Sequence, residues 1–99
     1  MPYFSIETNQ TVDTAANRDL MKKMSAFIAD LLGKPESYVM IAIKPGTPLI
    51  FAGSDEPLAY LELKSIGLPE SITADVSKAL CELVSSATGI APDRIYIEF

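Results

Sequence analysis

The sequence has 99 residues, of which 48% are hydrophobic and 21% charged, and its net charge is −5. This length predicts one domain with a modest core, and the acidic balance excludes nucleic acid as a partner, because phosphate contacts need clustered Lys and Arg. The absence of histidine excludes Ser-His-Asp and Cys-His catalysis, and a single cysteine, Cys81, excludes an internal disulfide and a zinc site built on several Cys. The sequence has no signal peptide and no apolar run of roughly 18 residues, so we expect no membrane partner and a protein that is cytoplasmic or exported without a signal peptide.

The first half of the chain has the pattern of a strand, a helix and a second strand. Residues 2–8 alternate polar and apolar side chains with the period of two that is typical of a half-buried strand. After a polar turn, Asp13 is a candidate N-cap for a helix that carries one apolar stripe to about Leu32. A Gly and a Pro directly beyond this stripe predict the end of the helix. Residues 38–44, YVMIAIK, are nearly all apolar, which predicts a strand covered on both faces.

The second half repeats this pattern after a loop. Residues 45–57, PGTPLIFAGSDEP, form a Pro- and Gly-rich loop in which one short strand is expected at Leu49–Phe51. A strand follows in 58–67, a second amphipathic helix in Ser71–Thr88 and a last strand in 94–99. The segments GKPESYVMI and GIAPDRIYI share a helix-ending Gly, a nearby Pro, an acidic residue and a strand with an aromatic side chain.

These two units predict an α+β fold in which two βαβ repeats form a four-stranded mixed sheet with both helices on one face. The other face of the sheet would then be uncovered. Because the strands read as apolar on both faces, we expect this face to pack against other subunits, and a homotrimer fits two βαβ units arranged around a ring. A monomeric α+β sandwich with an apolar patch is the alternative on pattern alone.

The segments MPYFSIETN, LLGKPESYVMI, FAGSDEP, KSIG and PDRIYI occur in an order and at spacings similar to those of the macrophage migration inhibitory factor family, within the tautomerase superfamily. The resemblance extends over essentially the whole chain and makes residues 1–99 one domain, with the C-terminal tail of the family missing. It implies a trimer with active sites at the subunit boundaries and keto–enol tautomerisation of phenylpyruvate-like α-keto acids. We expect no cofactor and no metal.

The resemblance implies that Pro2 is the general base, once removal of Met1 makes its nitrogen the terminal amine. Tautomerisation needs a base that is largely unprotonated near neutral pH. An α-amino group titrates at about 8 in water, and burial among apolar side chains would lower its pKa. The proline ring also fixes φ, which would hold the nitrogen rigidly at the start of the strand. The structural alternative is that Pro2 only governs the removal of Met1.

The same resemblance implies roles for four further residues. Lys34 would bind the substrate carboxylate and help to lower the pKa of the proline, and the alternative is a solvated lysine near a helix C-terminus. Ile66 would contact the substrate through its backbone N–H. Tyr96, contributed by the adjacent subunit, would stack against the substrate ring, unless it only packs within its strand. Tyr38 matches an aromatic residue at the pocket rim.

Two departures from the family pattern bear on function. Leu58 and Leu61 stand where the mammalian protein has a Cys-x-x-Cys pair, so thiol–disulfide oxidoreductase activity has no chemical basis. Cys81, near the apolar side of the second helix, is expected to behave as a buried small hydrophobe. Glu98 replaces an asparagine near the distal end of the pocket, where a carboxylate would disfavour anionic rings and could accept a hydrogen bond from a phenol. Glu98 therefore predicts altered substrate preference, with hydratase activity as the weaker alternative.

The sequence leaves two other functions open. The chain could be a cytokine-like signalling or interaction protein with a vestigial tautomerase pocket and a host receptor as its partner. It could also be a small trimeric domain that binds no ligand. Receptor binding by an inert Pro2 variant would favour the first of these, and a trimer without a pocket at the subunit boundary would favour the second.

Overall fold

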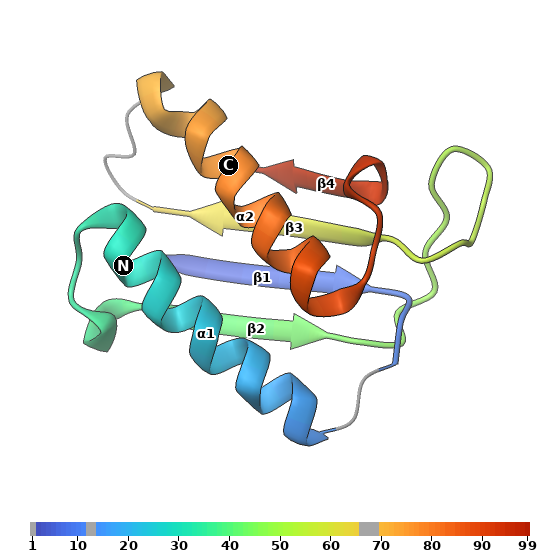
Figure 1. Cartoon of the computed structure of the whole chain (residues 1–99), viewed down its shortest axis with the longest axis horizontal. Helices are drawn as coiled ribbons and strands as arrows, with labels where there is room; N and C mark the ends of the chain where they lie inside the picture. The colour runs from blue at the N-terminus through green and yellow to red at the C-terminus, as the bar shows by residue number, and fades with distance from the viewer. Residues whose placement is uncertain (1, 12–13, 66–69) are drawn as a thin grey trace.

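The protein is a four-stranded sheet with two long helices packed across one of its faces (Figure 1). The computed structural model describes residues 2–11, 14–65 and 70–99. The strands are β1 (Tyr3–Thr8), β2 (Met40–Lys44), β3 (Ala59–Lys64) and β4 (Ile95–Glu98), and the helices are α1 (Thr14–Leu32) and α2 (Thr73–Thr88). Three short 3₁₀ helices, η1 (Glu36–Tyr38), η2 (Glu70–Ile72) and η3 (Pro92–Arg94), precede β2, α2 and β4.

The order of the strands across the sheet is β2-β1-β3-β4. β1 is parallel to β2, β3 is parallel to β4, and the two βαβ units meet where β1 runs antiparallel to β3. Figure 1 shows α1 and α2 lying side by side over the same face of this mixed sheet. The predicted α+β fold of two βαβ repeats is therefore confirmed.

The core lies between the sheet and the two helices. β1 and β3 are the central strands, and their inward side chains are almost fully buried. Both helices present apolar residues to them at four-residue spacing, which is the period of a buried helical stripe. The core set is Phe4 and Ile6 of β1, Leu61 and Leu63 of β3, Leu20, Met24 and Ile28 of α1, and Val76, Leu80 and Val84 of α2. The apolar stripes expected for both helices are thus confirmed.

Both helices end at a glycine in the left-handed conformation, as predicted. Gly33 has a φ of 64°, and the N–H of Lys34 donates to the carbonyl of Ala29 at 2.9 Å, which satisfies one of the last carbonyls of α1. Gly89 has a φ of 77°, and its N–H donates to the carbonyl of Ser85 at 2.9 Å. A side chain with a Cβ is strained at such angles, so glycine determines where each helix stops.

One predicted strand is absent, and the bounds of several elements differ from the prediction. No strand forms at Leu49–Phe51, where the described loop contains only a bridge in which Phe51 and Ser54 exchange two backbone hydrogen bonds of 3.0 Å. The φ angles of 53° at Ala52 and 75° at Gly53 turn the chain back within two residues, which is the geometry of a type I′ turn, and the described pairing ends after this one bridge. In addition, α2 begins two residues later than predicted, because η2 precedes it.

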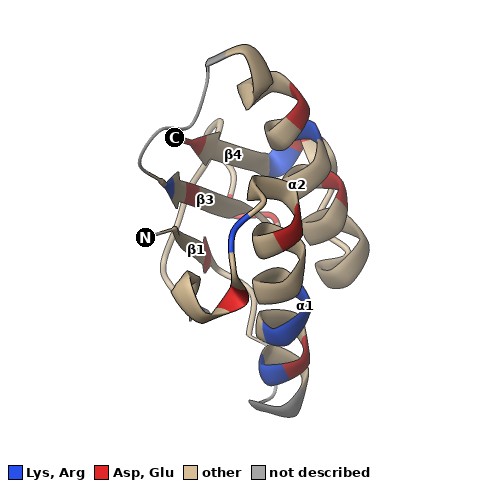
Figure 2. Ribbon diagram, turned by 90° about the vertical axis from the view of Figure 1, so that its left-hand side faces the viewer, with Lys and Arg blue, Asp and Glu red and all other residues tan. Residues whose placement is uncertain are grey.

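The sheet face opposite the helices, here called the open face, points away from both helices (Figure 2) and carries charged and hydroxyl groups beside apolar and aromatic ones. The expectation that the strands are apolar on both faces is wrong, because the period of two places charged and hydroxyl groups on the outward side of every strand. β2 is a partial exception, because its outward Met40 and Ala42 are apolar, and Met40 is 59% exposed. The outward set is Tyr3, Ser5 and Glu7 of β1, Met40, Ala42 and Lys44 of β2, Tyr60, Glu62 and Lys64 of β3, and Tyr96 and Glu98 of β4.

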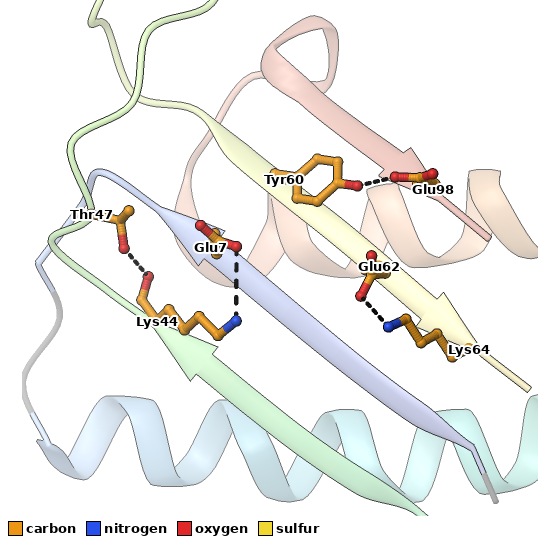
Figure 3. A network of polar contacts seen from close by, with 7 residues as sticks. All are labelled: Glu7, Lys44, Thr47, Tyr60, Glu62, Lys64 and Glu98. Atoms are coloured by element: carbon orange, nitrogen blue, oxygen red, sulfur yellow. Dashed lines mark hydrogen bonds and ion pairs between the residues drawn. The ribbon is translucent and has the colours of Figure 1, made fainter.

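Ion pairs connect some of these outward side chains (Figure 3). The Nζ atom of Lys44 lies 3.8 Å from the carboxylate of Glu7 on the neighbouring strand. The Nζ atom of Lys64 lies 3.4 Å from the carboxylate of Glu62. Exposed pairs of this kind contribute only about 0–1 kcal/mol each to stability. Their main consequence is that the negative charges of Glu7 and Glu62 are neutralised locally.

Candidate active site

The start of β1 lies in the middle of one end of the sheet, and Pro2 directly precedes it. The side chain of Pro2 is fully buried. Its carbonyl accepts a hydrogen bond of 2.9 Å from the N–H of Met40, the first residue of β2. β3 ends on the other side, because Tyr3 pairs with Lys64. Pro2 is therefore held between two neighbouring strands at what we call the proline end of the sheet.

The segment between α1 and β2 brings Lys34 and Tyr38 to the proline end (Figure 1). The turn at Gly33 leads the chain out of α1, and Pro35 then adopts extended angles, with φ of −61° and ψ of 139°, before η1 begins. η1 ends at Tyr38, whose side chain is 55% exposed, and Lys34 is exposed as well. The proline end thus combines a buried proline with an exposed lysine and an exposed tyrosine, three of the residues predicted for the site.

Ile66 lies outside the described residues, so its predicted backbone contact stays a prediction. The described part of β3 leads toward it. Lys64, the last residue of β3, is opposite Tyr3, and Ser65 follows it at the proline end.

Tyr96 and Glu98 lie away from the proline end within one chain. Tyr96 is opposite Tyr60 of β3, and Tyr60 is opposite Glu7, which is five residues beyond Pro2 along β1. With a rise of about 3.3 Å per residue and about 4.8 Å between strands, the backbones of Tyr96 and Pro2 are roughly 19 Å apart. A single chain does not bring these residues together, and the contribution of Tyr96 by an adjacent subunit stays a prediction.

Tyr60, Tyr96 and Glu98 form a cluster of their own on the open face. The rings of Tyr60 and Tyr96 are stacked, with centroids 5.9 Å apart and an angle of 19° between their planes. The hydroxyl of Tyr60 donates a hydrogen bond to the Oε2 atom of Glu98 (Figure 3). This bond, with smaller contributions from desolvation and from the negative charges of Glu98 and Glu62, raises the pKa of Tyr60 to about 12. Tyr60 is therefore a neutral donor throughout the physiological range.

A cavity of about 310 Å³ adjoins this cluster. Its walls come from the starts of β3 and β4 and from the loop that precedes β3, and they are mostly apolar or aromatic. Tyr60 and Tyr96 supply one wall, and the loop supplies Ile50 and Phe51. An apolar cavity beside a few fixed polar groups is the usual setting of a small-molecule site.

Sequence reasoning did not include Tyr60, although a signal was present. The sequence contains Tyr-x-Glu twice, as YLE at 60–62 and as YIE at 96–98. The two copies lie on adjacent parallel strands in register, so that Tyr60 faces Tyr96 and Glu62 faces Glu98. A motif that recurs at equivalent positions of the two βαβ units predicts neighbouring side chains on one face of the sheet.

The positions of the missing Cys-x-x-Cys pair belong to the core. Leu58 is 6% exposed and Leu61 is fully buried. Cys81 is half-buried and packs against the core, so it is less enclosed than expected. Burial raises the pKa of its thiol, and a hydrogen bond with Ser77 opposes this in part. Cys81 is therefore a protonated, weakly reactive thiol.

Two further observations concern only residues 2–11, 14–65 and 70–99. No three His, Cys, Asp or Glu side chains among them gather closely enough to bind a metal ion. None of their helices is both long and apolar enough to cross a membrane.

The fold and the proline end define an α+β protein of two βαβ repeats whose central strand begins directly after a buried proline. The chain belongs to the macrophage migration inhibitory factor family, whose model matches residues 1–99. A homologue from Brugia malayi is 39% identical over 100 residues, covering 100% of this chain and 86% of the relative. The factor of Mus musculus is 31% identical, with the same coverage. The resemblance inferred from the sequence motifs is confirmed.

Solved structures of the family agree with this assignment. The homologue from Prochlorococcus marinus has a TM-score of 0.91 and 42% identity, covering 98% of this chain and 85% of the other. The factor from Trichinella spiralis has a TM-score of 0.88 and 33% identity, covering 98% and 86%. The family includes tautomerases, which are isomerases, and proteins with cytokine-like roles, and its fold is an oligomeric one that takes small-molecule substrates.

Proposed function

We propose that this protein is a keto–enol tautomerase for phenylpyruvate-like α-keto acids, with the amine of Pro2, freed by removal of Met1, as the general base. The observation that supports this most is the place of Pro2, which is fully buried and held between β2 and β3 by strand pairing and by the hydrogen bond from Met40. Burial disfavours the charged ammonium, so the amine is expected to titrate below its usual value of about 8.

The reaction needs one proton to move between two atoms of the substrate. The proline nitrogen would take a proton from the carbon beside the carbonyl, and the carbonyl oxygen would gain a proton as the enol forms. Lys34 would bind the carboxylate of the substrate and place that carbon next to the nitrogen. The exposed position of Lys34 at the proline end supports this role, because its side chain is accessible to a ligand. Tyr38 would form the rim of the pocket, and Ile66 would supply a backbone N–H.

We propose further that residues 1–99 act as one domain in a homotrimer with its sites at the subunit boundaries. Three of the exposed apolar side chains lie away from the proline end, with Ile50 72% exposed, Tyr96 58% and Phe51 38%. These side chains are suited to contact a neighbouring copy. In such an assembly Tyr96 would stack on the ring of a substrate bound by the neighbour's Pro2, with Glu98 at the distal end of the ring.

The test of the base compares two forms of the protein on the same assay. In one form Met1 is removed, as checked by intact mass, and Pro2 carries the terminal amine. In the other an alanine inserted before Pro2 makes its nitrogen an amide, which cannot accept a proton. We expect phenylpyruvate tautomerisation to fall at least about 100-fold in the second form, because a general base contributes about 10²–10⁴ in rate. Equal rates in two folded forms would rule out Pro2 as the base.

A cytokine-like signalling role is the second candidate, with a receptor as the partner. It is supported by the loop before β3, which extends beyond the sheet and carries the exposed Ile50 (Figure 1). Apolar side chains on a projecting loop suit contact with another protein. Receptor binding that persists in Pro2→Gly and is lost in Ile50→Ser would favour this role over catalysis.

A further inference from the structure

The carboxylates of the open face differ in what neutralises them. Glu7 pairs with Lys44, and Glu62 pairs with Lys64. Glu98 lies within hydrogen-bonding distance of the neutral hydroxyl of Tyr60, and no Lys or Arg among the described residues lies within ion-pair distance of it. Of these three carboxylates, Glu98 is therefore the one whose negative charge is not balanced by a lysine.

The phenol of Tyr60 restricts Glu98 without removing its charge. A phenol can donate one hydrogen bond, and it goes to the Oε2 atom of Glu98, which leaves the Oε1 atom free to accept from a ligand. A Glu side chain on an exposed strand otherwise samples several rotamers, which lowers the strength of any contact that it makes. The bond to Tyr60 selects rotamers in which the carboxylate lies beside the ring of Tyr60 (Figure 3).

The same ring also orients Tyr96. Tyr60 and Tyr96 are opposite each other on parallel strands, and their rings are stacked at 5.9 Å. Tyr60 therefore touches both residues that are expected to contact the distal part of a ligand, Tyr96 through its ring face and Glu98 through its hydroxyl. The cavity beside Tyr60 and Tyr96 leaves space next to this cluster.

We propose that Tyr60 is a positioning residue for Glu98 and Tyr96, and that this cluster selects aromatic acids whose ring carries a cationic, hydrogen-bond-donating substituent opposite the carboxylate-bearing chain. The inference rests on the proposed function, in which Lys34 binds the carboxylate and Tyr96 and Glu98 face the ring. A ligand with a negative group at one end and a positive group at the other then meets Lys34 at the first end and Glu98 at the second. A ring with an anionic substituent would face Glu98 and be rejected.

The test uses three unreactive ligands of nearly equal shape, namely 4-aminomethylcinnamate, 4-methylcinnamate and 4-carboxycinnamate. Their dissociation constants are measured by calorimetry at low and at high salt. We expect the aminomethyl ligand to bind about three- to fivefold more tightly than the methyl ligand, as one exposed ion pair allows, and the carboxy ligand to bind more weakly than both. High salt should reduce this selectivity, because it screens exposed charges.

Variants separate the charge of Glu98 from its positioning. Glu98→Ala should abolish the preference for the aminomethyl ligand, and Tyr60→Phe, which keeps the stacked ring, should reduce it to about half. In the Glu98→Ala background Tyr60→Phe should cause no further change. Glu62→Gln is the matched control, because it removes a charge that Lys64 already neutralises and should leave the preference intact.

The hydrogen bond between Tyr60 and Glu98 can be tested separately from ligand binding. Absorbance of the phenolate at alkaline pH reports the ionisation of the tyrosines. The carboxylate of Glu98 opposes ionisation of Tyr60, whose neighbours on the open face also include Glu62, Glu7 and Tyr96. One tyrosine should therefore ionise at about pH 12 in the native protein and at a lower pH in Glu98→Ala.

The outcomes of these measurements distinguish a failure of the inference from a failure of the proposed function. Equal binding of the aminomethyl and methyl ligands would overturn the inference while leaving the proposed function intact, since the methyl ligand still reports the site. A preference that disappears in Glu98→Ala but is unchanged in Tyr60→Phe would overturn the role of Tyr60. Failure of all three ligands to bind, with no tautomerase activity, would overturn both.

Discussion

The two βαβ units share one framework but use its equivalent positions differently. After each helix the chain passes a left-handed Gly, then a residue with φ of −61° and ψ of 139°, then a 3₁₀ turn that leads into a strand. In the second unit the residue after the Gly is Ile90, which is 1% exposed and part of the core. In the first unit the equivalent residue is Lys34, which is exposed.

The end of the 3₁₀ turn shows the same contrast. In the second unit this position is Arg94, whose guanidinium donates to the carbonyls of Phe51, Glu56 and Ser54 at 2.7, 2.8 and 3.0 Å. It also lies over the ring of Phe51, 5.4 Å from the centroid. In the first unit the equivalent position is Tyr38, which is 55% exposed. The second unit thus uses this position to hold a loop, whereas the first leaves it accessible.

The strands that open the two units complete the comparison. Pro2 precedes Tyr3 in the first unit as Ala59 precedes Tyr60 in the second, and both Pro2 and Ala59 are buried. Ala59 lies within a continuous chain, so its nitrogen is an amide. Only a residue at a processed chain end has an amine. The repeated fold therefore supplies the same buried position twice, and the proposed removal of Met1 would give only the copy at Pro2 an amine.

If only the first unit supplies a base, replacing Pro2 by glycine should reduce activity much more than replacing Ala59 by glycine. Pro2→Gly keeps a terminal amine but removes the ring that fixes its position, and we expect phenylpyruvate tautomerisation to fall about 100-fold, because misplacing a reacting group by about 1 Å can cost this much. Ala59→Gly removes only a buried methyl group and should leave kcat unchanged, at a cost of about 1 kcal/mol in stability. Steady-state kinetics on both variants measures the contrast, which would be lost if both retained native rates.

The stabilising role of the second unit should be visible in the free energy of unfolding. Arg94→Met removes the hydrogen bonds to the loop carbonyls, several of them partly exposed, and we expect a loss of about 1–2 kcal/mol. Tyr38→Phe at the equivalent position should change stability by less than about 0.5 kcal/mol, because it alters an exposed side chain. Urea titrations at one protein concentration compare the two. Equal losses of unfolding free energy in the two variants would show that this position stabilises both units to the same extent.

The proposed role of Lys34 in substrate binding would be visible in KM. Lys34→Met removes the cation proposed to bind the substrate carboxylate, and we expect KM for phenylpyruvate to rise about tenfold with a smaller change in kcat. Lys23→Met is the control, since it removes the same charge from an exposed position on α1. A similar rise in KM for both variants would indicate a general field effect and not a contact with Lys34.

The smallest expected effect is the contribution of Cys81 to stability. Cys81 lies on α2 at the position that Ser25 occupies on α1. Burial raises the pKa of the Cys81 thiol above its usual 9.0, so the folded protein keeps the thiol protonated. Its contribution to stability is complete below pH 9.0 and is lost as the pH rises through the folded-state pKa. We expect Cys81→Ser to cost less than about 1 kcal/mol and to weaken the fall in stability above that pH.

Urea titrations on the native protein and on Cys81→Ser at pH 8 and pH 10 test this sign. Iodoacetamide should also label Cys81 more slowly in the folded protein than in urea, because the thiolate is the reactive form. Labelling at equal rates would contradict a raised pKa.

Local signals in the sequence were sufficient for most of the helices and strands. Periods of two and 3.6 placed the strands and helices, and the glycines after α1 and α2 placed their ends, because these signals act within a few residues. Pro2, Lys34 and Tyr38 were predicted as site residues only through the resemblance to the family. Their location at the same end of the sheet follows once β1 and β2 pair in parallel.

Only the tertiary structure decided which side chains from distant segments meet. The set of side chains on the open face depends on strand register, and the contacts of Tyr60 with Glu98 and of Arg94 with the loop join residues about 40 positions apart. No local propensity encodes such pairs, because they form only when long-range strand pairing brings the segments together. The sequence by itself thus determined the two repeats and the proline that begins them, whereas packing decided that one unit holds its loop and the other exposes its lysine.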